Sequence, residues 1–142
     1  MVMNTKIYKQ VHSLAKDLLR ASEYEDQAGF DKGYAQLQQV CEAHENTAKD
    51  HPVQWETLAD FTEDFNLAIT LYNKALEKAE AINSSDFCSS IGYSTAMMKL
   101  ELGDQAGAIK SLEKAKISSA EIEDKNLKAE IHDLLTELKS AR

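Results

Sequence analysis

The side chains in this sequence that are best suited to chemistry are its two cysteines and four histidines. Cys41 and His44 lie three positions apart, so both would point to one side of a helix, and a thiolate beside an imidazole is a common part of a zinc site. A closed zinc site needs about four ligands, and only His51 follows nearby. A metal-binding helical bundle or an enzyme built on these residues is therefore kept as an alternative. We expect core and surface roles for them, with no metal and no cofactor.

Carboxylates form clusters at Glu23-Glu25-Asp26, Glu63-Asp64 and Glu121-Glu123-Asp124. Each cluster lies near an expected helix end or turn, where negative charge stabilises the start of a helix and favours solubility. We interpret the clusters in that way. The sequence has no P-loop, GxGxxG, HExxH or GxSxG motif. It therefore carries none of these known motifs for a catalytic nucleophile, a metal site or a phosphate-binding loop. We expect a protein that is not an enzyme.

Composition favours one folded domain and excludes a nucleic-acid partner. The chain has 142 residues, of which 43% are hydrophobic and 28% charged, values typical of a globular protein. Lys and Arg number 16 against 24 Asp and Glu, and the resulting net charge of −8 repels nucleic acid. Basic residues on the first predicted helix lack interleaved aromatics, so we interpret them as a solvated face: Lys6, Lys9, Lys16 and Arg20.

The chain carries no predicted targeting or membrane segment. Its first twenty residues lack an uninterrupted apolar stretch and a cleavage site. No run of about 18 apolar residues is present to cross a bilayer. Cys41 and Cys88 leave one disulfide possible but do not make a disulfide framework. We expect a cytoplasmic protein with free thiols and no membrane partner.

Hydrophobic periodicity predicts seven helices and no strand. The first helix covers about 4–25, and the last carries a stripe of Leu127, Ile131 and Leu135. Pro52, the only proline, fits the first turn of a third helix because its missing N–H would be unpaired there. With so few glycines and prolines the chain lacks the turn residues of an all-β protein, so the pattern indicates an all-α fold.

Stop and cap signals predict where the later helices end. A fifth helix over about 86–102 ends at Gly103-Asp104. No glycine or proline separates the sixth helix from the seventh. We therefore place the break at Ser118-Ser119, with Ser118 and Glu121 spaced as a capping box.

The predicted fourth and sixth helices repeat one pattern of residues. Five residue types recur at a constant offset of 40: Asp64, Ala68, Ile69, Lys74 and Ala75 match Asp104, Ala108, Ile109, Lys114 and Ala115. The small residues let a neighbouring helix approach closely, and Tyr72 or Leu112 fills the space between them. A fainter copy contains Gly33, Leu37 and Val40. Such units bury their apolar faces by stacking on one another.

The segment EDFNLAITLYNKAL, from Glu63 to Leu76, resembles the turn and second helix of a tetratricopeptide repeat (TPR). Gly103-Asp104 is similar to the usual turn of that family. The first helices depart from the pattern, because the family's first-helix tyrosine corresponds to Tyr24, Ala59 and Lys99, of which only the first matches. The spacing of 40 is similar to that of long-repeat members.

The resemblance implies an all-α fold, an α-α superhelix of about three TPR-like helix pairs plus a C-terminal capping helix. Residues 1–142 would form a single TPR-like domain with repeats at about 4–46, 51–83 and 86–119 and a capping helix at about 122–140. A plain helical bundle is the alternative to such stacking.

The resemblance also implies that the first helices line a concave side that holds a polypeptide. On the family register the contact positions, with Asp26 beside them, are Leu18, Ser22, Glu25, Val53, Thr57, Asp60, Phe61, Tyr93, Met97, Leu100 and Glu101. This set is apolar, aromatic and acidic, and it lacks the basic clamp with which some family members hold acidic C-termini. It indicates a basic or amphipathic peptide. Core packing stays open as an alternative for Phe61, Tyr93 and Met97.

Our leading hypothesis is a non-catalytic protein–protein interaction module, an adaptor or chaperone. A narrower alternative is a small immunity-type inhibitor or a secretion chaperone for a basic protein, which the charge of −8 would attract. A homodimer formed through the amphipathic first and last helices also stays open, because about three repeats are the minimum for a stable stack.

Overall fold

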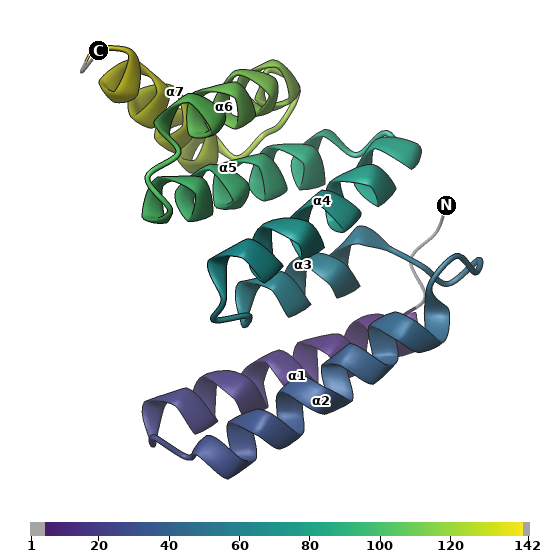
Figure 1. Cartoon of the computed structure of the whole chain (residues 1–142). Coiled ribbons are helices and arrows are strands. Elements are labelled where there is room, and N and C mark those ends of the chain that lie inside the picture. Colours follow the sequence, from purple (N-terminus) through teal and green to yellow (C-terminus); the bar gives the residue numbers. More distant parts are fainter. Residues whose placement is uncertain (1–4, 141–142) are drawn as a thin grey trace.

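In the computed structural model, which describes residues 5–140, the chain folds into seven helices, and no strand occurs between those limits. The helices are α1 (Thr5–Glu23), α2 (Gln27–His44), α3 (Pro52–Asp60), α4 (Phe65–Ala81), α5 (Ser85–Glu101), α6 (Gln105–Ser119) and α7 (Lys125–Ser140). The all-α prediction with seven helices is confirmed, and each helix packs against the next (Figure 1). None of the described helices has an apolar stretch of the length needed to cross a bilayer.

Aspartate residues cap the second helix of each successive pair. Each accepts a hydrogen bond from the backbone N–H three positions later, which satisfies a donor that the helix leaves unpaired and places negative charge at its positive end. The bonds join Asp26 to Gly29 at 2.9 Å, Asp64 to Leu67 at 3.0 Å and Asp104 to Gly107 at 2.9 Å. The interpretation of the acidic clusters as helix-start charges is confirmed for Asp26 and Asp64.

The caps show how the first copy differs from the other two. In α4 and α6 the first small residue of the pattern lies four positions after the capping aspartate, and the residue at that place in α2 is Phe30, not Gly33. Gly33, Leu37 and Val40 are buried as the faint copy indicates, seven or more positions after the cap. Gly33 permits close approach of α1, since a Cβ there would lie 3.1 Å from Leu18 Cδ2. The match of Tyr24 to a core tyrosine was wrong, because Tyr24 is 76% exposed.

Helices α1, α4 and α5 end in one common turn. A single residue adopts the left-handed conformation, with φ of +53° at Glu25, +53° at Asn83 and +78° at Gly103. The residue after it caps the next helix and donates its N–H back to the last turn, as Asp104 does to the Lys99 carbonyl at 2.8 Å. The predicted stop at Gly103-Asp104 is confirmed, and the turn sets the angle between neighbouring helices.

The predicted break between the last two helices was placed too early. Ser119 belongs to α6, and its hydroxyl donates to the Lys116 carbonyl at 2.9 Å. Asp124, which accepts from Leu127 N at 3.0 Å, caps α7, so this helix begins at residue 125 rather than 122. The capping box of Ser118 with Glu121 is wrong, because a serine hydroxyl can bond back to its own helix and need not end it.

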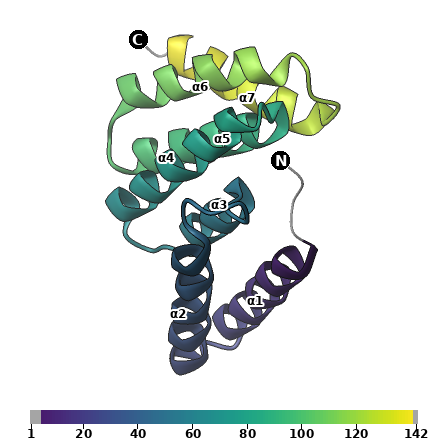
Figure 2. The same cartoon turned by 90° about the vertical axis from the view of Figure 1, so that its right-hand side faces the viewer.

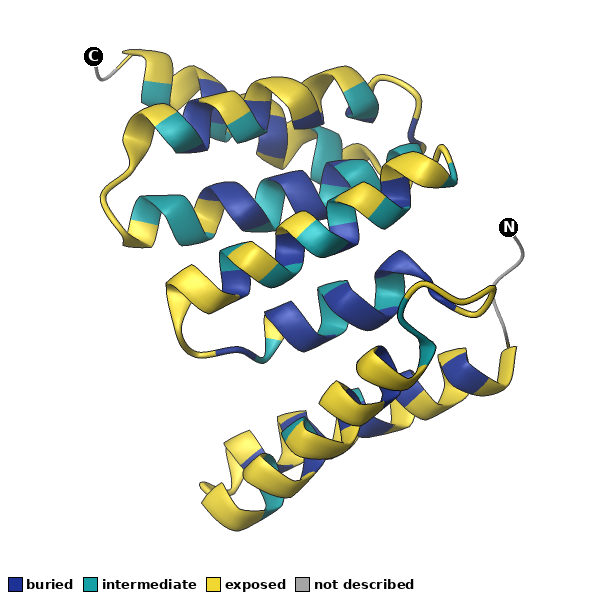
Figure 3. Ribbon diagram, turned by 45° about the vertical axis from the view of Figure 1, so that its right-hand side comes forward, coloured by how far each residue is buried: buried dark blue, intermediate teal, exposed yellow. Residues whose placement is uncertain are grey.

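Apolar side chains form two cores that share α5. The first joins α1 to α4 and includes Ile91 near the start of α5, and the second joins α5, α6 and α7 around Leu112 and Ile131. Figure 3 shows these buried faces turned toward the interior of the stack. Helices α5 and α6 approach closely at Gly92, where an added Cβ would lie 2.9 Å from the Cβ of Ala115. The small residues of the repeat thus permit close packing, as the pattern predicts.

The odd-numbered helices lie on the inner side of the stack. Helix α3 contacts both α1 and α5, and α5 also contacts α7, whereas among the described residues α2 does not contact α4 and α4 does not contact α6. Because the odd-numbered helices lie closer together than the even-numbered ones, the stack curves around them. Figure 2 shows the arrangement from the side, with α3 between the α1–α2 pair and the remaining helices.

Candidate partner-binding grooves

The most buried charged group lies in the turn between α2 and α3. Asp50 is 6% exposed, and its carboxylate accepts from Trp55 Nε1 at 2.8 Å and from the backbone N–H of Asn46 at 2.8 Å. The same carboxylate pairs with Lys78 of α4 at 2.9 Å, and Lys74 Nζ lies 4.4 Å from the centre of the Trp55 ring. This cluster fastens α4 to the turn, so its role is structural.

Two of the three residues considered as metal ligands, Cys41 and His51, lie in the same corner. Cys41 is buried, its thiol donates to the Gln54 carbonyl at 3.2 Å, and burial raises the pKa of that thiol to about 12. His51 caps α3, where its Nδ1 accepts from Val53 N at 3.1 Å, and burial lowers its pKa. Residues 5–140 contain no group of three or more His, Cys, Asp or Glu placed to hold a metal ion. The contacts of Cys41 and His51 therefore explain their positions without a ligand.

Three of the predicted partner contacts, Ser22, Asp60 and Phe61, meet in one groove of about 410 Å³. The groove lies where α1 and α3 end and where α2 and α4 begin, and Met98 of α5 reaches it from the next pair. We call it the edge groove. Glu63, in the turn between α3 and α4, also lines it.

The other predicted contacts lie elsewhere. Leu18 is 0% exposed and belongs to the first core, so its prediction as a partner contact is wrong; it lies on the buried stripe of α1. Exposed positions outside the edge groove are Glu25, Met97 and Glu101, and half-buried ones are Val53, Thr57, Tyr93 and Leu100. Tyr93 and Leu100 pack against the second core. Met98, the residue after the predicted contact Met97, lines the groove, while Gly92, Thr95 and Ala96 are buried on the core side of α5.

Aromatic side chains line the edge groove. The rings of Phe30 and Phe61 meet edge to face at 6.4 Å between centroids. The Tyr72 hydroxyl donates to Asp60 Oδ1 at 2.5 Å and so fixes that carboxylate beside the rings. Phe65 is 38% exposed at the rim. No Lys, Arg or His is among the described residues that line the groove. Its charged side chains, Asp60 and Glu63, are both acidic.

A second hollow of about 400 Å³ continues this surface. It shares Phe30, Phe61, Thr62 and Glu63 with the edge groove and extends to Asp31 and to the exposed side chain of Leu67. Carboxylates thus flank a strip of half-buried aromatic rings and the exposed Leu67 over the starts of α2 and α4. Such a strip suits the apolar side chains of a peptide that also carries positive charge.

Sequence reasoning missed Phe30 and Phe65, although both contribute rings to this surface. Each belongs to the second helix of a pair, a position that the family register assigns to the outer side. The available signal was that both follow a capping aspartate within the first turn, since Asp26 and Asp64 cap α2 and α4. Residues in the first turn of a helix lie at the edge of the stack, whether their helix is on its inner or its outer side.

A smaller acidic pocket of about 240 Å³ lies on the inner side, between the starts of α5 and α7. Its lining includes Glu56 of α3, Asp86 and Asp124. Glu56 Oε2 accepts from the Ser90 hydroxyl at 2.7 Å. Burial of Glu56 raises its pKa to about 7, and the nearby charge of Asp60 adds to this increase. Glu56 therefore titrates near neutral pH.

Replacing Glu56 with glutamine is expected to stabilise the fold at pH 8 and not at pH 4.5. The folded-state pKa of about 7 exceeds the ordinary 4.5, so Glu56 contributes stability below 4.5 that is lost as the pH rises through 7. The amide oxygen of the new side chain can accept the Ser90 bond without that loss. We expect a gain of about 1–3 kcal/mol at pH 8, measured by urea unfolding. The exposed control Glu121→Gln should show no such pH-dependent gain, and equal gains at both pH values would contradict the assignment.

The chain was compared with models of protein families, with curated proteins and with solved structures, and no match was found in any of the three comparisons.

Proposed function

We propose that this protein is a non-catalytic protein–protein interaction module of TPR-like architecture, and that its edge groove holds a basic, amphipathic segment of a partner polypeptide. The observation that carries the proposal is the edge groove itself, where aromatic rings and carboxylates meet and no basic side chain is among the described lining residues. A net charge of −8 over the chain adds long-range attraction for a cationic partner.

The TPR-like part of the proposal is supported by the geometry of the pairs. The capping aspartates Asp64 and Asp104 stand at the offset of 40 found in the sequence, and the helices that they cap bury the matching alanines. Contacts along the odd-numbered helices, without contacts between the even-numbered ones in the described part of the chain, are what a curved stack of helix pairs requires.

Binding in the edge groove would combine two interactions. Apolar side chains of the partner would cover Phe30, Phe61 and the exposed part of Phe65, because burial of such rings gives the largest share of interface energy. Lysine or arginine on the other face would meet Asp60 and Glu63 at the rim. Charges at the rim chiefly raise the association rate, so binding should weaken and slow as salt is added. A small inhibitor or secretion chaperone for a basic protein would use the same surface.

The proposal is tested by calorimetry with a synthetic amphipathic peptide that carries lysines on one face and leucines on the other. We expect Glu63→Gln/Phe65→Ala to weaken binding by about tenfold or more, since the second change removes an apolar anchor. Both side chains are exposed, so the fold should tolerate the changes.

The matched control is Glu121→Gln/Leu102→Ala, which removes one exposed carboxylate and one exposed leucine outside the groove. This variant should bind the peptide as the unmodified protein does. No binding to the unmodified protein, equal weakening in both variants, or tighter binding of a peptide with glutamates in place of the lysines would contradict the proposal.

A further inference from the structure

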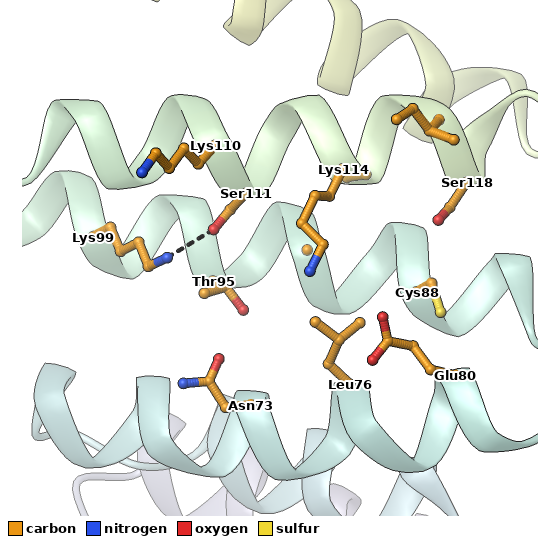
Figure 4. Close-up of a pocket in the computed structure, with 13 residues that line it drawn as sticks. Asn73, Leu76, Glu80, Cys88, Thr95, Lys99, Lys110, Ser111, Lys114 and Ser118 are labelled. Carbon is orange, nitrogen blue, oxygen red and sulfur yellow. Dashed lines mark hydrogen bonds between the residues drawn. The ribbon is translucent and has the colours of Figure 1, made fainter.

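A second groove, of about 340 Å³, lies on the outer side of the stack between α4 and α6 (Figure 4). Its floor lies where α5 and α6 meet, and the small residues Gly92 of α5 and Ala115 of α6 let these helices approach closely there. Because α4 and α6 do not contact each other within residues 5–140, a furrow stays open above this floor. We call it the lysine groove. It does not share a described lining residue with the edge groove.

Lysines set the charge of this groove in an otherwise acidic chain. Lys99, Lys110 and Lys114 line it, with Glu80 as the one carboxylate among the described lining residues. Lys99 Nζ donates to the Ser111 hydroxyl at 2.9 Å. None of the three lysines forms an ion pair within residues 5–140, although other lysines of the chain do. Their charge is therefore available to an incoming anionic group.

Apolar side chains form the walls between these charges. Leu76 of α4 borders one side, and Ile117 of α6 borders the other. Ile117 is 78% exposed, more than any other large hydrophobic residue of the described part. Exposing so much apolar surface of an isoleucine to water is unfavourable. An apolar side chain docked in the groove would cover that surface and so stabilise the complex.

We propose that the lysine groove docks an acidic, amphipathic peptide segment of a protein partner. Apolar side chains of that segment seat on the Gly92–Ala115 floor between Leu76 and Ile117, and its carboxylates meet Lys99, Lys110 and Lys114. Charge complementarity selects the sign of the partner. The apolar walls select a peptide over a nucleic acid, whose phosphates would gain nothing from Ile117 and would be repelled by the net charge of −8.

The two grooves therefore prefer opposite charges and lie on different sides of the stack. A chain with both could hold a basic segment at the edge groove and an acidic segment at the lysine groove at the same time. The lysine groove does not depend on the edge groove, so either can fail its test without the other.

Short random peptides displayed on phage provide the test. They are selected on the unmodified protein and then depleted of those that bind Lys99→Gln/Lys114→Gln. We expect the remaining peptides to be rich in Asp and Glu with apolar residues on one side. As synthetic peptides they should bind the double variant about tenfold or more weakly. The control Lys116→Gln/Lys125→Gln removes two exposed lysines outside the groove and should bind the peptides unchanged.

Cys88 reports whether the peptides occupy the groove itself. Its thiol lines the groove and is half-buried, whereas Cys41 is buried in the first core. A bound peptide should slow alkylation of Cys88 by iodoacetamide in proportion to occupancy. The proposal is overturned if the selected peptides are not acidic, if both lysine variants bind alike, if Cys88 is alkylated at an unchanged rate, or if a single-stranded oligonucleotide competes as well as the acidic peptide.

Discussion

Replacing Asp50 with alanine is expected to lower the free energy of unfolding by about 3–5 kcal/mol, which is a large part of the stability of a domain of this size. The change leaves the ammonium of Lys78 without its partner in a place where that side chain is 15% exposed. It also leaves Trp55 Nε1 and the Asn46 N–H without their acceptor. An unpaired buried charge and two unpaired donors add their desolvation costs.

Urea unfolding followed by tryptophan fluorescence measures this loss, because Trp55 is the only tryptophan and lies in the cluster. Asp50→Asn keeps one acceptor for Trp55 and should lie between alanine and the unmodified protein. Asp133→Ala removes an exposed carboxylate of α7 and should change stability by no more than about 0.5 kcal/mol. A loss below about 1 kcal/mol for Asp50→Ala would show that the cluster does not hold α4 to the turn.

Replacing Leu18 with alanine is expected to cost about 2–5 kcal/mol of stability. Leu18 is fully buried between α1 and α2, where it lies close to Gly33, and truncation leaves a cavity that these two packed helices cannot close. The neighbouring Leu19 is 56% exposed, so Leu19→Ala removes the same atoms from the surface and should change stability by no more than about 0.5 kcal/mol.

The pair also decides between the two roles considered for Leu18. If Leu18 is a core residue, the folded fraction of Leu18→Ala binds the basic peptide with the affinity of the unmodified protein. Retained stability together with weakened peptide binding would instead return Leu18 to the partner surface and contradict the position of α1 in the stack.

The helices themselves could be predicted because each carries a periodic apolar stripe with a cap or stop at its end. Ile7, Val11 and Leu14 are buried on one face of α1 as their spacing indicates, and Pro52 begins α3. The seventh helix began later than predicted because Ser118 and Ser119 are compatible with both a helix interior and a cap. Local sequence alone could not choose between these states, and the cap supplied by Asp124 decided it.

The sites were harder to predict because they depend on contacts between elements. The Asp50 cluster joins a turn to α3 and α4, and no spacing in the sequence links Asp50 to Lys78. The edge groove takes Phe30 and Phe65 from helices that were assigned to the outer side. The groove also takes Met98 of α5, which the sequence did not single out because Tyr93, Met97 and Leu100 show no clean apolar stripe.

The most direct test of the proposed binding surface is an NMR titration of the labelled protein with the basic amphipathic peptide, followed at the backbone amides. We expect the largest shifts at Ser22, Phe30 and residues 60–65, with the amides of α6 and α7 unchanged. Shifts confined to α6 and α7, or no shifts at peptide concentrations that saturate binding, would contradict the account.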